Sequence, residues 1–512
     1  MESIAWCGSK LYTLNSKLKT KDGMLITSIK NKDLSLVARC RTTGENVFIE
    51  ADDNAIVKRL ATEAEAYNLA ENNGHRMECY VILDGATSLW LLQTVGLPKN
   101  IQDKADVVAT TAADLLAKTI FVKLPKTSST PETQKSKLSL DRQPINADSD
   151  CTVHLVICGT SALTEPLAIN AAMVAHYPNY CRDNRLRTRI TIIDDDIDQQ
   201  RSRLLQRYQH LFANSYHRSI DLTQNNPAAT LHRPYFERQR QDFVDIEWEF
   251  IRGNIRSEAV RQKLALWAQS PRQQLTVAMV HDDDNRNFDE TFSLPEEVYR
   301  SNIPVLCHLS RTDMVSMVAA QGSYKHVIPI SENDCQLSTL CTLKQLAMRV
   351  NYVYGHCFAL SPDDPITAPA SIPTEELEPQ WTQIGSLTKQ YSNIYNAMTL
   401  GTKMHSLGHR EDDWQQCYAL SASEIEVMTA VEHNRWSVEE LMLGYRPLTD
   451  DEQRQVEQDT TLKKKLRNEQ KAHYDLRSFD DLRADDTGKN SQVYDQVLTQ
   501  GIPLIIKSCI SS

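Results

Sequence analysis

The middle of the chain alternates short apolar runs with longer stretches that have a helical pattern. Val153 to Cys158 is a continuous apolar run, which is typical of a parallel strand buried on both faces. Further strand candidates are residues 189–193, 246–251, 275–280, 303–309 and 326–330, with helical patterns between them. Strands that alternate with helices need crossover connections. The pattern therefore predicts a doubly wound parallel, Rossmann-like sheet over residues 151–360.

Two segments without apolar periodicity divide the chain into three blocks. Residues 124–150 are polar and rich in Ser, Thr and Lys, and residues 361–374 carry four prolines, which disrupt regular elements. In block 1–123, strand-like runs at 24–29, 34–38 and 79–83 and an Ala- and Glu-rich helix near 54–72 predict a small α/β domain of unknown role. Block 375–512 has mainly helical patterns. We therefore expect an α/β chain with three domains and two linkers.

Composition narrows the class of protein. The 512 residues carry a net charge of −11, which argues against a general binder of nucleic acid or anionic membranes. The twelve cysteines are scattered without a CxxC pair, as expected of free thiols in a reducing compartment. The first residues lack the pattern of a signal peptide, and no apolar stretch reaches the roughly 18–20 residues that span a bilayer. We expect a cytoplasmic protein without membrane insertion.

The first strand-to-helix turn of the middle block is the candidate nucleotide site, because such sheets bind ligands beyond the carboxyl ends of their strands. A dinucleotide fingerprint has three glycines, and the matching positions here are Gly159, Ser161 and Thr164. Asp194 and Asp195 end the second strand, where a carboxylate accepts ribose hydroxyls. Asp194 could equally cap the next helix. A second acidic run, residues 281–284, fits a helix cap better than a ribose or Mg²⁺ contact.

The element order, the turn at Gly159 and the acidic strand end resemble the nucleotide-binding domain of potassium-uptake regulators, the TrkA N-terminal type. Residues 248–253 and 303–306 are similar to bacterial relatives of that family that also carry a ryanodine-receptor repeat. Those relatives often have membrane segments, and none is visible here. The resemblance implies binding of NAD(H), an ADP-ribose-like or an ATP-like nucleotide that biases conformation. A purely structural sheet remains the alternative.

The last block contains a helix with an unusual run of polar and aromatic residues. Ser423 to Glu426 matches a capping box, which predicts the start of this helix, and Gly444 predicts its end. Within it lie His433, Asn434, Arg435 and Trp436, and Tyr445 follows the end. An exposed Arg435 beside these groups would bind a phosphate and stack on a base, with polar contacts from His433 and Lys489. Alternatively, His433 and Trp436 anchor the helices and Arg435 pairs with Glu439.

This region resembles the ryanodine-receptor repeat over about 80 residues. The residues that carry the resemblance are His433 and Trp436, the turn Gly444-Tyr445-Arg446-Pro447, the segment His473 to Leu476 and Lys489. Tyr474 stands where the repeat usually has proline, and Pro447 where glycine is common. The resemblance implies an all-helical module and allows a role in ion homeostasis or in antiphage defence.

Enzyme signatures are missing from the sequence. There is no phosphate loop of the GxxxxGK type, no HExxH and no nucleophile elbow, and no metal site is predicted. The favoured hypothesis is a non-catalytic sensor in which the middle sheet, the C-terminal repeat or the crevice between them binds a small nucleotide. Its output would be contact with a protein partner or self-assembly. A diverged NAD-dependent oxidoreductase and a ligand-free scaffold are the alternatives.

Overall fold

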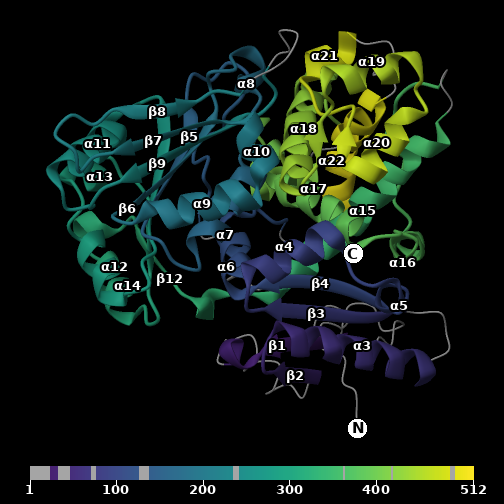
Figure 1. Cartoon of the computed structure of the whole chain (residues 1–512), viewed down its shortest axis with the longest axis horizontal. Coiled ribbons are helices and arrows are strands. Elements are labelled where there is room, and N and C mark those ends of the chain that lie inside the picture. Colours follow the sequence, from purple (N-terminus) through teal and green to yellow (C-terminus); the bar gives the residue numbers. More distant parts are fainter. Residues whose placement is uncertain are drawn as a thin grey trace.

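The computed structural model describes residues 23–32, 46–70, 76–125, 138–234, 242–360, 364–416, 419–484 and 491–511. Two main sheets, in which nearly all strand pairs are parallel, and a group of helices make up most of these residues (Figure 1). The small sheet lies at the bottom of the view, the large sheet at the left and the helical module at the upper right. Within these ranges, no helix combines the length and the apolar character needed to cross a membrane.

The large sheet has the strand order β12-β11-β10-β5-β6-β9-β7-β8, and every pair is parallel except β7 with β8. Its strands are β5 (Thr152–Cys158), β6 (Thr188–Asp194), β7 (Tyr216–Asp221), β8 (Ala229–His232), β9 (Ile246–Arg252), β10 (Gln273–Met279), β11 (Val305–His308) and β12 (Val327–Ile330). The predicted doubly wound parallel sheet is therefore confirmed. The strand order reverses between β5 and β10, so the turn after β5 lies at the switch point.

Helices follow most strands of this sheet. They are α7 (Thr164–Val174), α8 (Asn179–Arg182), α9 (Ile197–Arg207), α10 (Gln209–Asn214), α11 (Glu258–Gln269), α12 (Asp284–Thr291), α13 (Glu296–Arg300) and α14 (Asp313–Ala319). The strands that bear helices on both faces are nearly completely buried, as the continuous apolar runs indicated.

The small sheet has the order β2-β1-β3-β4 and is parallel throughout. Its elements are β1 (Gly23–Ser28), β2 (Asn46–Glu50), α3 (Asp53–Ala70), β3 (Met77–Leu83), α4 (Ala86–Val95), α5 (Lys99–Gln102), β4 (Ala105–Thr111) and α6 (Ala112–Phe121). The N-terminal block is thus a second doubly wound unit. The strand predicted at residues 34–38 lies outside the described residues.

The helical module contains α15 (Leu337–His356), α16 (Thr374–Thr382), α17 (Leu387–Ser406), α18 (Ala422–Met442), α19 (Asp450–Gln458), α20 (Leu462–Gln470), α21 (Phe479–Ala484) and α22 (Gln492–Ile510), with the short strands β13 (Arg446–Pro447) and β14 (Ala472–His473). Helix α15 falls in the middle block by sequence but packs against α17 and α22. The capping box of α18 is Ser421 with Glu424. The predicted box at 423–426 was two residues late, because both serines precede a glutamate by three positions.

The largest apolar core runs through all three blocks, and two smaller clusters lie in the large-sheet unit and in the helical module. Leu138, Leu140 and Ile145 are buried in the largest core, so residues 138–150 pack against the core and do not form a free linker. Asp141 in this segment pairs with Lys123 at 2.9 Å. On the small sheet, the hydroxyl of Tyr391 from α17 accepts from the amide of Ala109 and donates to its carbonyl. Ala109 lies in β4, the last strand of that sheet.

The cysteines differ in state. In the described ranges, eight cysteines are free thiols, whereas Cys341 is disulfide-bonded. The expectation of free thiols is thus correct for these eight and wrong for Cys341. Burial raises the pKa of the Cys79 and Cys158 thiols, which keeps them protonated and unreactive.

Candidate ligand site

The turn after β5 is tightly packed against the end of β10. Gly159 has φ +104°, and a Cβ placed on it would lie 2.6 Å from Nδ1 of His281. This glycine is therefore required by the close approach of His281, in addition to the turn itself. A dinucleotide site instead needs open space at this glycine for a pyrophosphate. The packing gives no support to a pyrophosphate site at Gly159.

Hydrogen bonds within the turn occupy its polar groups. The Ser161 amide donates to Oγ1 of Thr164 at 2.9 Å, and the Ser161 hydroxyl accepts from the Leu163 amide at 3.2 Å. The next residue in α7, Glu165, is buried and pairs with Arg207. A fixed carboxylate in the first helical turn repels a phosphate that approaches the same amides. Ser161 thus stabilises the turn, and its amide and hydroxyl are already used within it.

The carboxylates at the end of β6 are held in a network of charged side chains. Asp194 is buried, accepts from the Asp196 amide at 2.8 Å and lies 3.7 Å from Nδ1 of His281. His281 also contacts Glu290 at 2.7 Å. Asp195 is exposed and pairs with Arg286 at 3.0 Å. Both carboxylates therefore have protein partners where a ribose was predicted.

The second acidic run, residues 281–284, contains a helix cap, as predicted. Asp283 caps α12, accepting from the amides of Asn285 at 2.8 Å and Arg286 at 3.2 Å. In the described part of the chain, no group of three or more His, Cys, Asp or Glu side chains is arranged to hold a metal ion.

Arg435 lies inside the helical module, so the prediction of an exposed Arg435 is wrong. Its guanidinium is 2% exposed, contacts Glu432 at 2.7 Å and also pairs with Glu439. The alternative pairing with Glu439 is thereby confirmed. Lys403 of α17 pairs with the same Glu432. Burial alone would raise the pKa of the Glu432 carboxyl, but the Arg435 and Lys403 cations lower it to about 2.

Of the other residues predicted to line a pocket beside Arg435, two are buried and two are half-buried. His433 is buried between Asp495 at 3.0 Å and the carbonyl of Arg477 at 2.8 Å. Asn434 is also buried. Trp436 and Tyr445 are half-buried, and their ring centroids lie 4.9 and 6.2 Å from that of His473. His433 thus anchors the helices, as the alternative interpretation proposed, and Lys489 lies outside the described residues.

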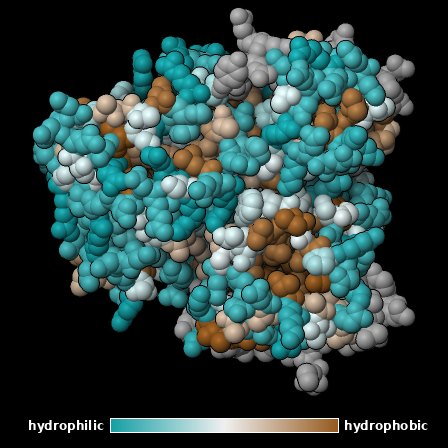
Figure 2. All heavy atoms as spheres, in the orientation of Figure 1, coloured by the Kyte–Doolittle hydropathy of each residue, from teal (hydrophilic) through white to brown (hydrophobic). Residues whose placement is uncertain are grey.

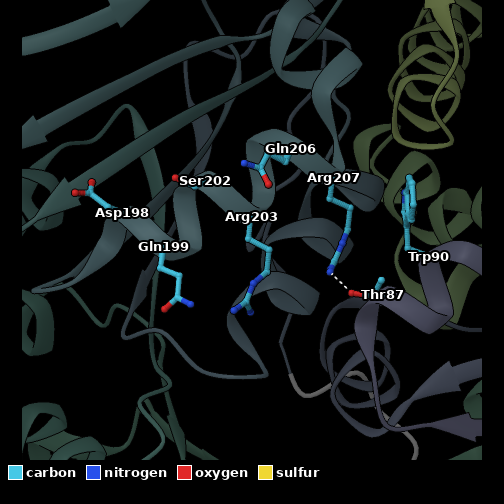
Figure 3. A pocket seen from close by; sticks show the side chains of 8 residues that line it. All are labelled: Thr87, Trp90, Asp198, Gln199, Ser202, Arg203, Gln206 and Arg207. Carbon is cyan, nitrogen blue, oxygen red and sulfur yellow. Dashed lines mark hydrogen bonds between the residues drawn. The ribbon is translucent and has the colours of Figure 1, made fainter.

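An open groove lies elsewhere, between α4 of the small sheet and α9 of the large sheet (Figure 3). Its volume is about 770 Å³. It is lined by polar side chains and one indole: Thr87, Trp90, Asp198, Gln199, Ser202, Arg203, Gln206 and Arg207. The α9 residues recur along one exposed stripe of the helix, which spans roughly 13.5 Å from 198 to 207.

The groove connects the carboxyl edges of both sheets. Asp198 is in the first turn of α9, after β6, and pairs with Arg252 at the end of β9. Thr87 is in the first turn of α4, after β3, and accepts from Arg207 (Figure 3). In open parallel α/β sheets, ligands bind beyond the carboxyl ends of the strands. The groove reaches this edge in both sheets, so it lies where proteins of this fold class bind ligands.

Two arginines give the groove its charge. Arg207 is held in place by Glu165 and Thr87. Arg203 is exposed, and among the described residues nothing forms a hydrogen bond or an ion pair with it. Figure 3 shows Arg203 extending from α9 on the side of Gln199. A free guanidinium beside a fixed one suits the oxygens of a phosphate group.

The α4 end of the groove is apolar. Trp90 is half-buried there, and its Nε1 donates to the carbonyl of Met442 at 3.4 Å. Figure 2 shows an apolar patch over the region of α4, where Leu91 is 45% exposed and Val95 is 77% exposed. An indole beside a cationic helix can stack on a planar ring.

This groove could not be predicted from local sequence patterns. Its α9 stripe looks like the ordinary polar face of a surface helix, and Trp90 lies in an apolar helix that is typical of a core. The arginines at 203 and 207 share a helix face because they are four residues apart. Only the packing of α4 near α9, more than a hundred residues later in the chain, makes them part of a site.

No family model matches the chain, and neither the curated proteins nor the solved structures include a significant match. The resemblances to the TrkA N-terminal domain and to the ryanodine-receptor repeat therefore remain predictions that rest on the residues quoted for them.

Proposed function

We propose that this protein is a non-catalytic sensor that binds a nucleotide or a nucleotide-derived molecule in the groove between α4 and α9. The observation that carries the proposal is Arg203, an exposed guanidinium without a protein partner among the described residues, which faces a groove of about 770 Å³ beside the fixed Arg207. This location replaces the Gly159 turn and Arg435, whose polar groups have protein partners.

The order of groups along the groove supports a nucleotide. Trp90 lies at one end and offers a ring to a base, and Arg207 and Arg203 follow along α9 and offer donors to phosphates. The roughly 13.5 Å between positions 198 and 207 leaves room beyond the arginines for the second ribose of an ADP-ribose-like molecule, and it exceeds what a free phosphate needs. NAD(H) is of the same class.

A ligand in this groove would contact elements from both sheets. It would favour the arrangement in which α4 and α9 are correctly spaced, and so shift the population of conformations toward it. Such a shift changes the surface that a partner or a second copy meets. A regulator that responds to a nucleotide in this way could act in ion homeostasis or in antiphage defence.

The direct test is a thermal-shift and calorimetry series with ADP, ATP, ADP-ribose and NAD⁺. A true ligand at a hundredfold excess over its Kd stabilises the protein by about 2.7 kcal/mol. Arg203→Ala should weaken binding roughly 10- to 100-fold, because a charge-assisted hydrogen bond contributes about 1.5–3 kcal/mol.

Arg300→Ala is the matched control. Arg300 is an exposed arginine on α13 of the large-sheet unit, and it pairs with Glu296 at 2.6 Å, outside the groove lining. Equal loss of affinity in both variants would mean that general charge, rather than the groove, attracts the ligand. Failure of all four compounds to bind, or steady consumption of NADH with a carbonyl substrate, would contradict the sensor proposal.

A further inference from the structure

Helix α4 belongs to the groove at its first turns and touches the helical module at its last turns. Trp90 lines the groove and donates through Nε1 to the carbonyl of Met442, the last residue of α18, at 3.4 Å. One turn later, the carbonyl of Thr94 accepts from Nζ of Lys471 at 3.2 Å. The same ammonium donates to the carbonyl of Leu443 at 3.0 Å. Lys471 therefore joins the end of α4 to the end of α18.

The backbone of Lys471 is itself unusual. It follows α20 and has φ +48°, and in the described ranges Asn302 is the only other residue besides glycine with positive φ. Asparagine tolerates this conformation far better than lysine. Such strain persists only where the surroundings fix it.

The surroundings of Lys471 explain how the strain is held. The amide of Arg446 donates to the carbonyl of Lys471 at 2.9 Å, as part of the pairing of β13 with β14. Gly444 has φ +86°, and a Cβ on it would lie 3.7 Å from Nζ of Lys471. Two residues with positive φ, Gly444 and Lys471, thus lie close to one ammonium. The residues that follow α18 and α20 therefore surround the Lys471 side chain, which reaches α4.

We propose that Lys471 is a positioning residue of the groove: its ammonium holds α4 against the ends of α18 and α20, so that ligand binding and the packing of the helical module are coupled. The nature of the ligand rests on the proposed function, whereas the coupling is a property of the free protein. By linkage, any effect of the ligand on this contact equals the effect of the contact on ligand affinity.

Hydrogen exchange of the full-length protein without ligand tests the coupling. Lys471→Asn removes the ammonium and keeps a residue that accepts left-handed backbone, while Lys471→Arg keeps a donor. Lys464→Asn makes the same replacement at an exposed position of α20. We expect Lys471→Asn to raise exchange severalfold in residues 86–95 and 197–207, and both other variants to behave as wild type.

A purely local role gives a different pattern. Faster exchange confined to residues 443–447 and 471–473 in Lys471→Asn would overturn the proposal. Trp90→Phe provides a second route, because it keeps a ring in the groove and removes the donor to Met442. If Lys471→Asn fails to fold, faster exchange at 443–447 in Trp90→Phe supports the coupling and wild-type exchange there overturns it.

Calorimetry with ADP separates this inference from the proposed function. Coupling predicts that Lys471→Asn weakens ADP binding about 3- to 10-fold although Lys471 does not line the groove, and that Lys471→Arg restores it. If wild type binds ADP and Lys471→Asn binds it equally well, the coupling fails and the sensor proposal stands. If wild type does not bind ADP, the sensor proposal fails for this nucleotide, and the exchange experiment still decides the coupling.

Discussion

The cluster around Arg435 and the groove around Arg203 use the same side chain in opposite ways. Arg435 is 2% exposed and has carboxylates from Glu432 and Glu439 within its own helix. Arg203 is exposed on α9, and nothing in the described part of the chain pairs with it. A buried charge must be paired to avoid a large desolvation cost. A conspicuous motif can therefore be structural, while an inconspicuous surface arginine is available to a ligand.

Removing the central carboxylate of the buried cluster should have the largest effect. Glu432→Gln leaves the buried cations Arg435 and Lys403 without their shared partner, and such a loss costs about 3–5 kcal/mol. Urea unfolding at pH 7 measures it. The control is Glu426→Gln, also on α18. It breaks an exposed ion pair with Arg483 of α21 and should cost less than about 1 kcal/mol. A loss below about 1 kcal/mol in Glu432→Gln would show that the cluster is not tightly paired.

Glu440, one residue beyond Glu439, should give an intermediate and pH-dependent effect. Burial raises the pKa of its carboxyl to about 8 from an ordinary value of 4.5. Between these values the native state keeps a proton that the unfolded chain has lost. Stability therefore falls as pH rises, by at most about 1.4 kcal/mol per pH unit. Above about pH 8 this contribution to the slope ends.

Glu440→Gln cannot titrate, so it tests that slope directly. The difference in unfolding free energy between this variant and wild type should change steadily from pH 5 to pH 8, with the variant gaining relative stability at the higher pH. Urea titrations at four pH values measure the difference. Parallel pH profiles for the two proteins would show that Glu440 ionises normally in the fold.

Arg203→Ala should have the smallest effect on the free protein. A surface side chain without partners changes stability by about 0.5 kcal/mol or less, even though we expect the same variant to lose ligand affinity. Thermal unfolding with and without ADP measures both effects in one experiment. A marked fall in the melting temperature of the free variant would mean that Arg203 supports the fold, which would weaken its assignment to a ligand.

The sequence predicted the large sheet because its central strands are continuous apolar runs bounded by helical patterns. Strands β7 and β8 escaped notice because Tyr216 to Asp221 and Ala229 to His232 are mostly polar and lie toward the edge of the sheet. The capping box was misplaced by two residues because Ser421 and Ser423 each stand three residues before a glutamate. The first error arises because packing forms strands without an apolar pattern, and the second because two equivalent local patterns overlap.

The candidate site was harder to predict than the fold. The pairing of Arg435 with Glu439 was visible as an i, i+4 spacing, but the role of Lys403, 29 residues before Glu432, was not. The groove depends on Thr87 and Arg207 meeting between the units of the two sheets, and no local spacing encodes that. The fingerprint glycine at 159 was correctly placed at a turn, yet its neighbour His281 decides what the turn can hold.

The hydroxyl of Tyr391 bonds to both backbone groups of Ala109 on β4, the outer strand of the small sheet. An outer strand with free amides and carbonyls is a template for pairing with another molecule. Helix α17 thus covers part of this strand and hinders its pairing with a strand of another molecule. A chain cut before α17 would expose this strand and should aggregate, so the N-terminal unit needs its distant helix to remain monodisperse.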